Sequence, residues 1–209
     1  MKNQENYIQE ISEIRSMMER SSKFLSLSGW SGIIAGIYAL AGAFIASYYL
    51  NFNPDRLFYD INSSSSFIPI IPNLILLAIL ILFFTLSTAI LLSYNKAKKK
   101  GEVIWNAASR QLLINLFVPI IAGSIFIWLL FINNIAGLLA PASLLFYGLA
   151  LFNASKFTYG EVKFLGIIQI SLGLISFYFI EYSLMFWAIG FGIVHIFYGI
   201  FIYMHYERD

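Results

Sequence analysis

The sequence offers few side chains that could carry out chemistry inside a hydrophobic protein, and His195 is the most prominent of them. His195 lies in a long apolar stretch, about 16 Å from the start of that stretch if the chain is helical. An ionisable group at such a depth is by default a functional candidate, because a charge is costly in hydrocarbon. Gln169 lies at a similar expected depth in the preceding apolar stretch, and Asn115 lies one helical turn before Pro119. These three residues are the candidate polar contacts.

Several kinds of chemistry are excluded or disfavoured by what the sequence lacks. The chain has no Cys, which rules out disulfides, thiolate catalysis, iron–sulfur clusters and Cys-bound zinc. His195 and His205 are about 15 Å apart along one helix, too far to hold one haem within a single chain. No acid lies away from the ends of the apolar stretches, which disfavours proton-coupled transport and a carboxylate metal site. We therefore expect no cofactor, no metal and no catalytic residue.

The composition predicts a membrane protein. The chain is 59% hydrophobic and only 11% charged, whereas a soluble domain is about 25% charged. A helix of about 20 apolar residues crosses a bilayer core. Six such stretches are present, at about 24–50, 70–94, 111–132, 134–153, 162–180 and 184–205. The sequence thus predicts an all-α fold in which residues 24–209 form a polytopic transmembrane bundle of six helices.

The distribution of Lys and Arg predicts the orientation. If the N-terminus is cytoplasmic, 12 of the 13 Lys and Arg residues lie on the cytoplasmic side and only Arg56 lies outside. This asymmetry fits the positive-inside rule and puts both termini in the cytoplasm. The same rule explains the run KAKKK at 96–100, with binding of anionic lipid headgroups as the alternative. A net charge of +2 is too small to indicate nucleic-acid binding.

Residues 1–23 are predicted to form an amphipathic helix at the cytoplasmic side. Five apolar residues share one face of it at 100° per residue: Tyr7, Ile8, Ile11, Ile14 and Met18. Such a helix either covers the cytoplasmic rim of its own bundle or binds a partner protein. Its balanced charge disfavours simple attraction to anionic lipid.

Small residues predict where the helices approach closely. Ser28, Gly32 and Gly36 follow at intervals of four in the first span. A second line of small residues lies on another face: Ala35, Ala39, Gly42 and Ala46. Such lines let membrane helices pack backbone to backbone. We expect the first span to pack on two faces inside the bundle, with homo-oligomerisation as the alternative.

The fifth and sixth spans are predicted to form a tight hairpin centred near Tyr182, so that residues whose numbers sum to about 364 lie at the same depth. This rule pairs Gln169 with His195 and predicts a hydrogen bond between them, worth about 0.6 kcal/mol for an average membrane pair. It also sets two close glycine pairs, Gly166 with Gly199 and Gly173 with Gly192. The polar pair would lie at the centre of a glycine-flanked contact.

Two prolines suggest bends. Pro119 cannot donate to the carbonyl of Asn115, so we expect a kink in the third span with the Asn115 side chain beside the freed carbonyl. Pro141 is expected to bend the fourth span similarly. Broken helices can line a solute pathway. A small carrier for an apolar or weakly polar solute is therefore the main alternative function.

Ser143 and His195 lie at similar expected depths, and a Ser on a fourth span with a His on a sixth resembles the rhomboid intramembrane proteases. The chain departs from that family around the serine, where Pro141-Ala142-Ser143-Leu144 lacks the glycines that shape the oxyanion site. The second span also lacks the histidine that the family uses. A serine hydrolase is the less favoured alternative.

Three further stretches resemble a group of bacterial six-span integral membrane proteins with no known activity. They read IRSMMERSSKFLSLSGWSG at 14–32, YGLALFNASKFT at 147–158 and GFGIVHIFYGI at 190–200. The resemblance implies a bacterial cytoplasmic (inner) membrane and adds no mechanism. We therefore expect a non-enzymatic accessory membrane protein whose cytoplasmic face, above all residues 1–23, binds a partner.

Overall fold

The computed structural model describes residues 23–52, 71–101, 105–133 and 135–208. Throughout these ranges the regular structure is helical, which confirms the predicted all-α class for this part of the chain. The amphipathic helix predicted over residues 1–23 falls outside the described residues, apart from Lys23.

The helices follow one another along the chain. In order they are α2 (Gly29–Phe44), the π-helical η1 (Ile45–Tyr49), α4 (Ile71–Lys100), α5 (Ala107–Ile132), the 3-10 turn η2 (Ala136–Leu138), α6 (Leu139–Ala154), the 3-10 turn η3 (Ser155–Phe157), α7 (Val162–Tyr178), the 3-10 turn η4 (Ile180–Tyr182), α8 (Ser183–Trp187), the π-helical η5 (Ala188–Val194) and α9 (His195–Tyr206). The stretch from α8 to α9 is a single continuous helical rod.

Four helical stretches among the described residues are long and apolar enough to cross a membrane: Gly29–Tyr49, Pro72–Lys99, Ala107–Ile132 and Ile180–Tyr206. They correspond to the first, second, third and sixth predicted spans. Helices α6 and α7 occupy the positions of the fourth and fifth, and they are shorter, at 16 and 17 residues.

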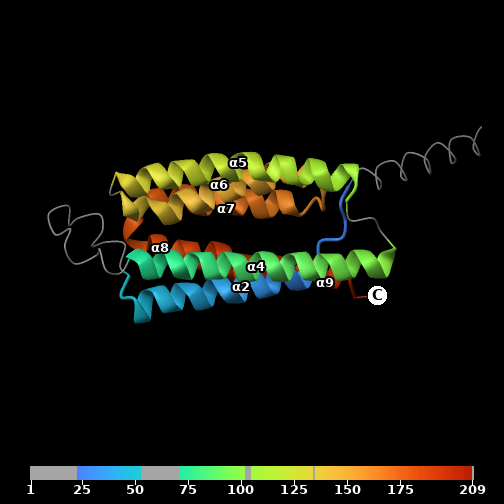
Figure 1. The fold of residues 1–209 in the computed structure, drawn as a ribbon, viewed down its shortest axis with the longest axis horizontal. Coiled ribbons are helices and arrows are strands. Elements are labelled where there is room, and N and C mark those ends of the chain that lie inside the picture. Colours follow the sequence, from blue (N-terminus) through green and yellow to red (C-terminus); the bar gives the residue numbers. More distant parts are fainter. Residues whose placement is uncertain (1–22, 53–70, 102–104, 134, 209) are drawn as a thin grey trace, which may run out of the picture.

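The helices lie side by side in two layers (Figure 1). One layer holds α5, α6 and α7, with α6 in contact with both of the others. The other holds α4, α2 and the α8–α9 rod, with α2 in contact with both α4 and the rod. The chain passes from the first layer to the second at η4. Residues of α7 and of the α8–α9 rod therefore meet at the interface between the layers.

Local sequence explains both ends of the connection between α4 and α5. Helix α5 begins with a reciprocal cap, in which the Asn106 side chain accepts from the Ser109 amide at 2.8 Å and the Ser109 hydroxyl accepts from the Asn106 amide at 2.9 Å. Helix α4 ends before Gly101, whose φ of 66° is a left-handed conformation that glycine adopts without strain.

The small residues of α2 pack on two sides, as expected. A Cβ built on Gly36 would lie 2.5 Å from the carbonyl oxygen of Gly192, so this line faces η5 and α9. A Cβ on Gly42 would lie 2.1 Å from Ile81, so the second line faces α4. Ser28 precedes the helix by one residue, as its N-cap, and its hydroxyl donates to Glu207.

The predicted glycine pairs between the fifth and sixth spans are wrong. Gly166 and Gly173 pack against α6, whereas Gly192 and Gly199 pack against α2. Equal depth in a hairpin does not fix which face each helix presents to the other. Here α7 and α9 lie in different layers, and each turns its thin glycine face to a neighbour in its own layer.

The two prolines have different outcomes. Pro119 lies inside α5, and the Asn115 carbonyl that it frees accepts from Nδ2 of Asn153 on α6 at 3.1 Å. The Asn115 side chain instead donates to the carbonyl of Gln111 at 2.8 Å, so the expected partner of the freed carbonyl was wrong. Pro141 lies in the first turn of α6, where a backbone N–H has no acceptor within the helix. The proline therefore removes no helical hydrogen bond there, and the reason for expecting a bend at Pro141 does not apply.

Candidate functional site

The three polar candidates do not form one site. Asn115 bonds within α5, whereas Gln169 of α7 and His195 at the start of α9 meet at the interface between the layers. Gln169 is fully buried, at 0% exposure, and His195 is 7% exposed. Gln169 Nε2 and His195 Nδ1 lie 3.3 Å apart.

Both side chains converge on one backbone atom, the carbonyl oxygen of Gly190. Gln169 Nε2 donates to it at 2.7 Å and His195 Nδ1 donates to it at 2.9 Å. Because a carbonyl oxygen only accepts, His195 Nδ1 carries a hydrogen and has no lone pair to offer Gln169. The predicted pairing of Gln169 with His195 is therefore present, and the two side chains are joined mainly through the shared Gly190 carbonyl.

The other ring nitrogen of His195 lies 2.9 Å from the hydroxyl of Tyr147 on α6, and the two rings stack with centroids 5.5 Å apart. The contacts of His195 within the described chain are thus a hydroxyl, an amide and a carbonyl, with no carboxylate to balance a positive charge. A charge at this depth is costly, so the imidazole is neutral and its Nε2 accepts from Tyr147. The sequence analysis did not single out Tyr147, whose residue type is ordinary for a membrane helix.

Gly190 is required at this crossing by close approach. A Cβ at position 190 would lie 2.5 Å from Leu144 Cδ2 and 2.6 Å from Gln169 Oε1. Gly190 also lies within η5, the π-helical stretch whose wider turn changes the regular i→i−4 pattern of backbone bonding. The missing side chain and the wide turn together let Gln169 reach the backbone of the neighbouring rod.

Ser143 takes no part in this cluster. Its hydroxyl donates to the carbonyl of Ala140 in its own helix at 2.7 Å. Both nitrogens of His195 are engaged by other groups. The hydrogen bond between serine and histidine that a hydrolase needs is therefore not formed.

A second polar region lies at one end of the bundle, and we call it the charged end. Lys96 Nζ, near the end of α4, forms an ion pair with Glu207 at 2.8 Å, and the two side chains are only 10% and 12% exposed. Lys96 also donates to the Leu27 carbonyl at 2.6 Å and to the Tyr159 hydroxyl at 3.2 Å. The beginning of α2, the end of α4, the connection from α6 to α7 and the end of α9 therefore meet here.

Glu207 also caps α2 from the far end of the chain. The Gly29 amide donates to one carboxylate oxygen at 2.7 Å and the Ser28 hydroxyl donates to the other at 3.3 Å. A carboxylate at a helix N-terminus satisfies free amides and interacts favourably with the helix dipole. Sequence analysis missed this cluster, because Lys96 was counted with the basic run 96–100. Lys96 is only partly exposed, whereas Lys98 and Lys99 are exposed.

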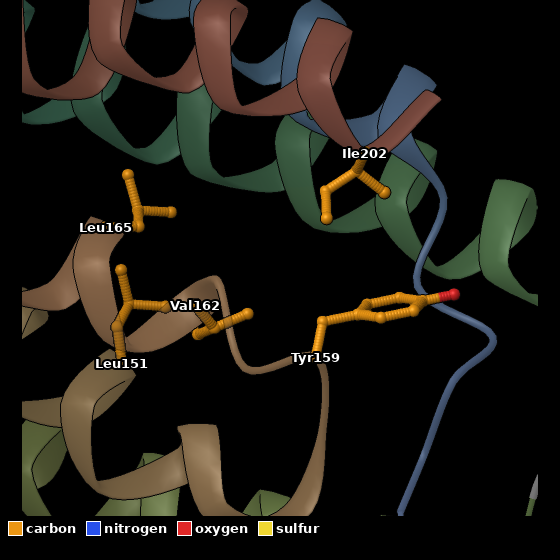
Figure 2. Packing of buried hydrophobic residues seen from close by; sticks show 5 residues of the cluster. All are labelled: Leu151, Tyr159, Val162, Leu165 and Ile202. Carbon is orange, nitrogen blue, oxygen red and sulfur yellow. The ribbon is translucent and has the colours of Figure 1, made fainter. Parts of the chain in front are cut away.

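Tyr159 connects the charged end to the hydrophobic core. Figure 2 shows its ring below Ile202, with the hydroxyl directed toward the segment that precedes α2. There the hydroxyl donates to the Leu25 carbonyl. The ring belongs to a buried cluster with Leu151, Val162, Leu165 and Ile202, which joins both layers.

Comparison of the chain with models of protein families, with curated proteins and with solved structures gave no match. In the part of the chain that the structure describes, no group of three or more His, Cys, Asp or Glu side chains could hold a metal ion. Two polar regions are therefore the functional candidates. One is a neutral cluster between the layers, and the other is an ion pair that ties the chain's end to the start of α2.

Proposed function

We propose that this protein crosses a bacterial inner membrane six times, with both termini in the cytoplasm. It acts as a non-enzymatic accessory protein that binds a partner at its charged end. The observation that carries the proposal is the construction of that end. The two acids that the structure describes at this end, Glu161 and Glu207, form internal hydrogen bonds, while most of the bases described there are exposed.

The internal bonds of the charged end are specific. Glu207 is held by Lys96, and Glu161 accepts from the Tyr206 hydroxyl at 2.9 Å. The bases exposed on the described helices and connections at this end are Lys23, Lys98, Lys99, Arg110, Lys156, Lys163 and Arg208. A surface with this excess of positive charge faces the cytoplasm under the positive-inside rule.

The attachment point of residues 1–22 supports a docking role for that segment. The Phe24 amide donates to the Phe157 carbonyl at 2.8 Å, and the Phe24 carbonyl accepts from the Thr158 hydroxyl at 2.9 Å. Residues 1–22 therefore join the bundle at a point that is bonded to the connection between α6 and α7. A partner bound by this segment would be held against the exposed bases.

The proposal of six spans depends on α6 and α7. Helix α7 has 17 residues, which corresponds to about 26 Å. With η2 and η3, α6 forms part of a helical stretch from 136 to 157. The contacts of Lys96 bring Leu27, Tyr159 and Glu207 to one end of the bundle, which fits a chain that returns to that end after each pair of spans.

The two alternatives draw less support. The hydrolase needs a Ser143 to His195 bond, whereas Ser143 bonds to Ala140. The carrier was based on bends at both prolines, and only Pro119 lies inside a helix beyond its first turn.

Single cysteines test the topology directly, because the natural chain has none. Asn133→Cys, Lys156→Cys and Tyr182→Cys mark the two ends of α6 and of α7. In intact cells, a membrane-impermeant maleimide is expected to label Asn133→Cys and Tyr182→Cys, and to label Lys156→Cys only after permeabilisation. Labelling of all three from one side would reduce the number of spans to four.

Partner binding is tested by comparing the full chain with a deletion of residues 1–20, both tagged at the C-terminus and purified from native membranes. We expect a specific protein that copurifies with the full chain and is lost from the deletion at equal expression. The variant Lys98→Glu/Lys99→Glu should weaken the same association. If no protein depends on residues 1–20, the accessory role is wrong even if the six-span topology holds.

A further inference from the structure

Five buried polar atoms have no hydrogen-bond partner within the described chain, and all five lie between residues 161 and 198. They are Glu161 Oε2, Gln169 Oε1, Ser176 Oγ, Ser183 Oγ and Tyr198 hydroxyl oxygen. Each belongs to α7, to the α8–α9 rod or to the residue preceding α7. Helix α7 contacts α8 and η5, and we call this set of atoms the polar seam.

The seam runs along the length of the bundle. Gln169 and Ser176 are seven residues apart and so share one face of α7, and both are fully buried, at 0% exposure. At 1.5 Å per residue, Gln169 lies about 12 Å and Ser176 about 22 Å from Glu161. Ser183 begins α8, close to the far end of α7. The unpartnered atoms thus occur at several depths.

Tyr198 joins the seam to the cluster around His195. It packs against the same buried hydrophobic cluster as Tyr147, and Tyr147 bonds to His195. At the other end Glu161 is bonded to Tyr206, an exposed residue at the charged end. The order from the charged end inward is therefore Glu161, Tyr198, Tyr147 and His195.

Lipid cannot satisfy these atoms. A hydrocarbon chain offers neither donor nor acceptor, and polar groups buried without a partner are rare in native proteins. Buried water fills this role where several polar groups converge, and each buried water commonly makes about three hydrogen bonds. Five unpartnered atoms on a single interface fit water better than five independent defects.

We propose that the polar seam binds ordered water molecules at several depths, from Glu161 at the charged end, past His195 and Gln169, to Ser176 and Ser183. The water accepts from the hydroxyls of Ser176, Ser183 and Tyr198 and donates to the free oxygens of Gln169 and Glu161. Because Tyr147 occupies Nε2 of His195, the water between Glu161 and Tyr198 connects the imidazole to the aqueous phase at the charged end through the Tyr147 hydroxyl. The seam depends on the fold alone and not on the proposed partner.

Substitutions that remove a single hydroxyl group test the seam, because the direction of the change in Tm differs between a hydrated and a dry seam. Ser176→Ala, Ser183→Ala and Tyr198→Phe each remove one unpartnered hydroxyl and little volume. If the seam is hydrated, each variant removes a hydrogen-bond partner of a bound water, and its Tm falls. If the seam is dry, each removes a buried polar group that has no partner, and its Tm rises or stays unchanged. Ser171→Ala is the control, because Ser171 is exposed on the same helix, and its Tm should not change.

Transfer of magnetisation from water tests the same proposal without a substitution. The full chain, labelled with 15N at Gln and His and reconstituted in lipid, is expected to show rapid transfer from water to the Gln169 amide and to the His195 Nδ1 hydrogen. Tyr198→Phe should slow the transfer to His195, while transfer to the exposed His205 stays unchanged. Absence of transfer to His195 and Gln169 in the unmodified chain would overturn the proposal, whatever the sign of the Tm changes.

Discussion

The charged end and the cluster around His195 both hold several helices together, but they do so with different chemistry. At the charged end, Lys96 and Glu207 carry full charges and bond to the segment before α2 and to the start of α2. Between the layers, Gln169 and His195 are uncharged and share one carbonyl oxygen. The ion pair joins α4, the start of α2 and the end of α9, which lie in one layer. Lys96 also donates to the hydroxyl of Tyr159 from the other layer. The neutral cluster bonds α6 and α7 to the rod in the other layer.

This difference follows from depth. A charge near the membrane surface keeps partial access to water, whereas a charge at the centre is costly. The protein therefore uses an ion pair at its end and neutral donors and acceptors inside. The strength expected from each region follows the same order, and the substitutions below test that order from the largest effect to the smallest.

Glu207→Ala is expected to have the largest effect. It leaves the Lys96 ammonium partly buried without its carboxylate and removes the cap from α2. Breaking a buried pair by removing one partner costs about 3 kcal/mol, and the free energy of unfolding in mild detergent should fall by about this amount. The exposed neighbour offers a matched control, since Arg208→Ala should change stability by less than about 0.5 kcal/mol. Equal effects of the two variants would show that the ion pair contributes nothing.

Gly36→Ala is expected to come second, because it acts on the packing beside the His195 cluster. The added Cβ would lie 2.5 Å from the Gly192 carbonyl and 2.6 Å from Ile196. Overpacking of this kind costs about 2 kcal/mol. Gly160→Ala is the control, because a Cβ there would meet nothing within 4 Å. Thermal unfolding should therefore separate the two glycines clearly, and similar Tm values would contradict the close approach of α2 and η5.

His195→Ala removes one interhelical hydrogen bond, to Tyr147 of α6, and one hydrogen bond within the rod, to the Gly190 carbonyl. At about 0.6 kcal/mol for each bond in a membrane protein, the loss of stability should be about 1 kcal/mol, with a smaller loss for Tyr147→Phe. The measurement is again the free energy of unfolding in detergent. A His195→Ala variant as stable as the natural chain would mean that the cluster does not hold the layers together.

Asn153→Ala is expected to have the smallest effect, because it removes one bond, to the carbonyl that Pro119 frees. The expected loss is about 0.6 kcal/mol. In a Pro119→Ala background, the residue at 119 regains an amide that can bond to the Asn115 carbonyl, so the effect of Asn153→Ala should vanish. An effect that is the same in both backgrounds would show that Asn153 acts elsewhere.

The sequence predicted the features that depend on depth and on apolar length. Hydropathy indicated the four long helices, and the hairpin rule brought Gln169 and His195 to the same level. The sequence could not reveal which helix faces meet, because the rotation of each helix about its axis is decided by packing with helices that are distant in sequence. Gly166 and Gly199 were therefore assigned to each other although each packs on another neighbour.

The same limit explains the polar contacts that were missed. The ion pair joins Lys96 to Glu207, and no local pattern singles out Lys96 from the lysines beside it. The Gly190 carbonyl is a backbone atom, whose availability depends on the local π-helical geometry of η5. Tyr147 and Asn153 have ordinary residue types for a membrane helix, and their partners become evident only when α6 is placed between α5 and α7.

The most direct test of the neutral cluster is the 15N spectrum of the natural chain labelled only at histidine and reconstituted in lipid at neutral pH. The chain has two histidines, and the His195→Ala spectrum assigns them. We expect His195 to have a hydrogen on Nδ1, bonded to the Gly190 carbonyl, and a bare Nε2 that accepts from Tyr147. A hydrogen on Nε2, whether in the other neutral tautomer or in the charged form, would contradict this account of how the two layers are joined.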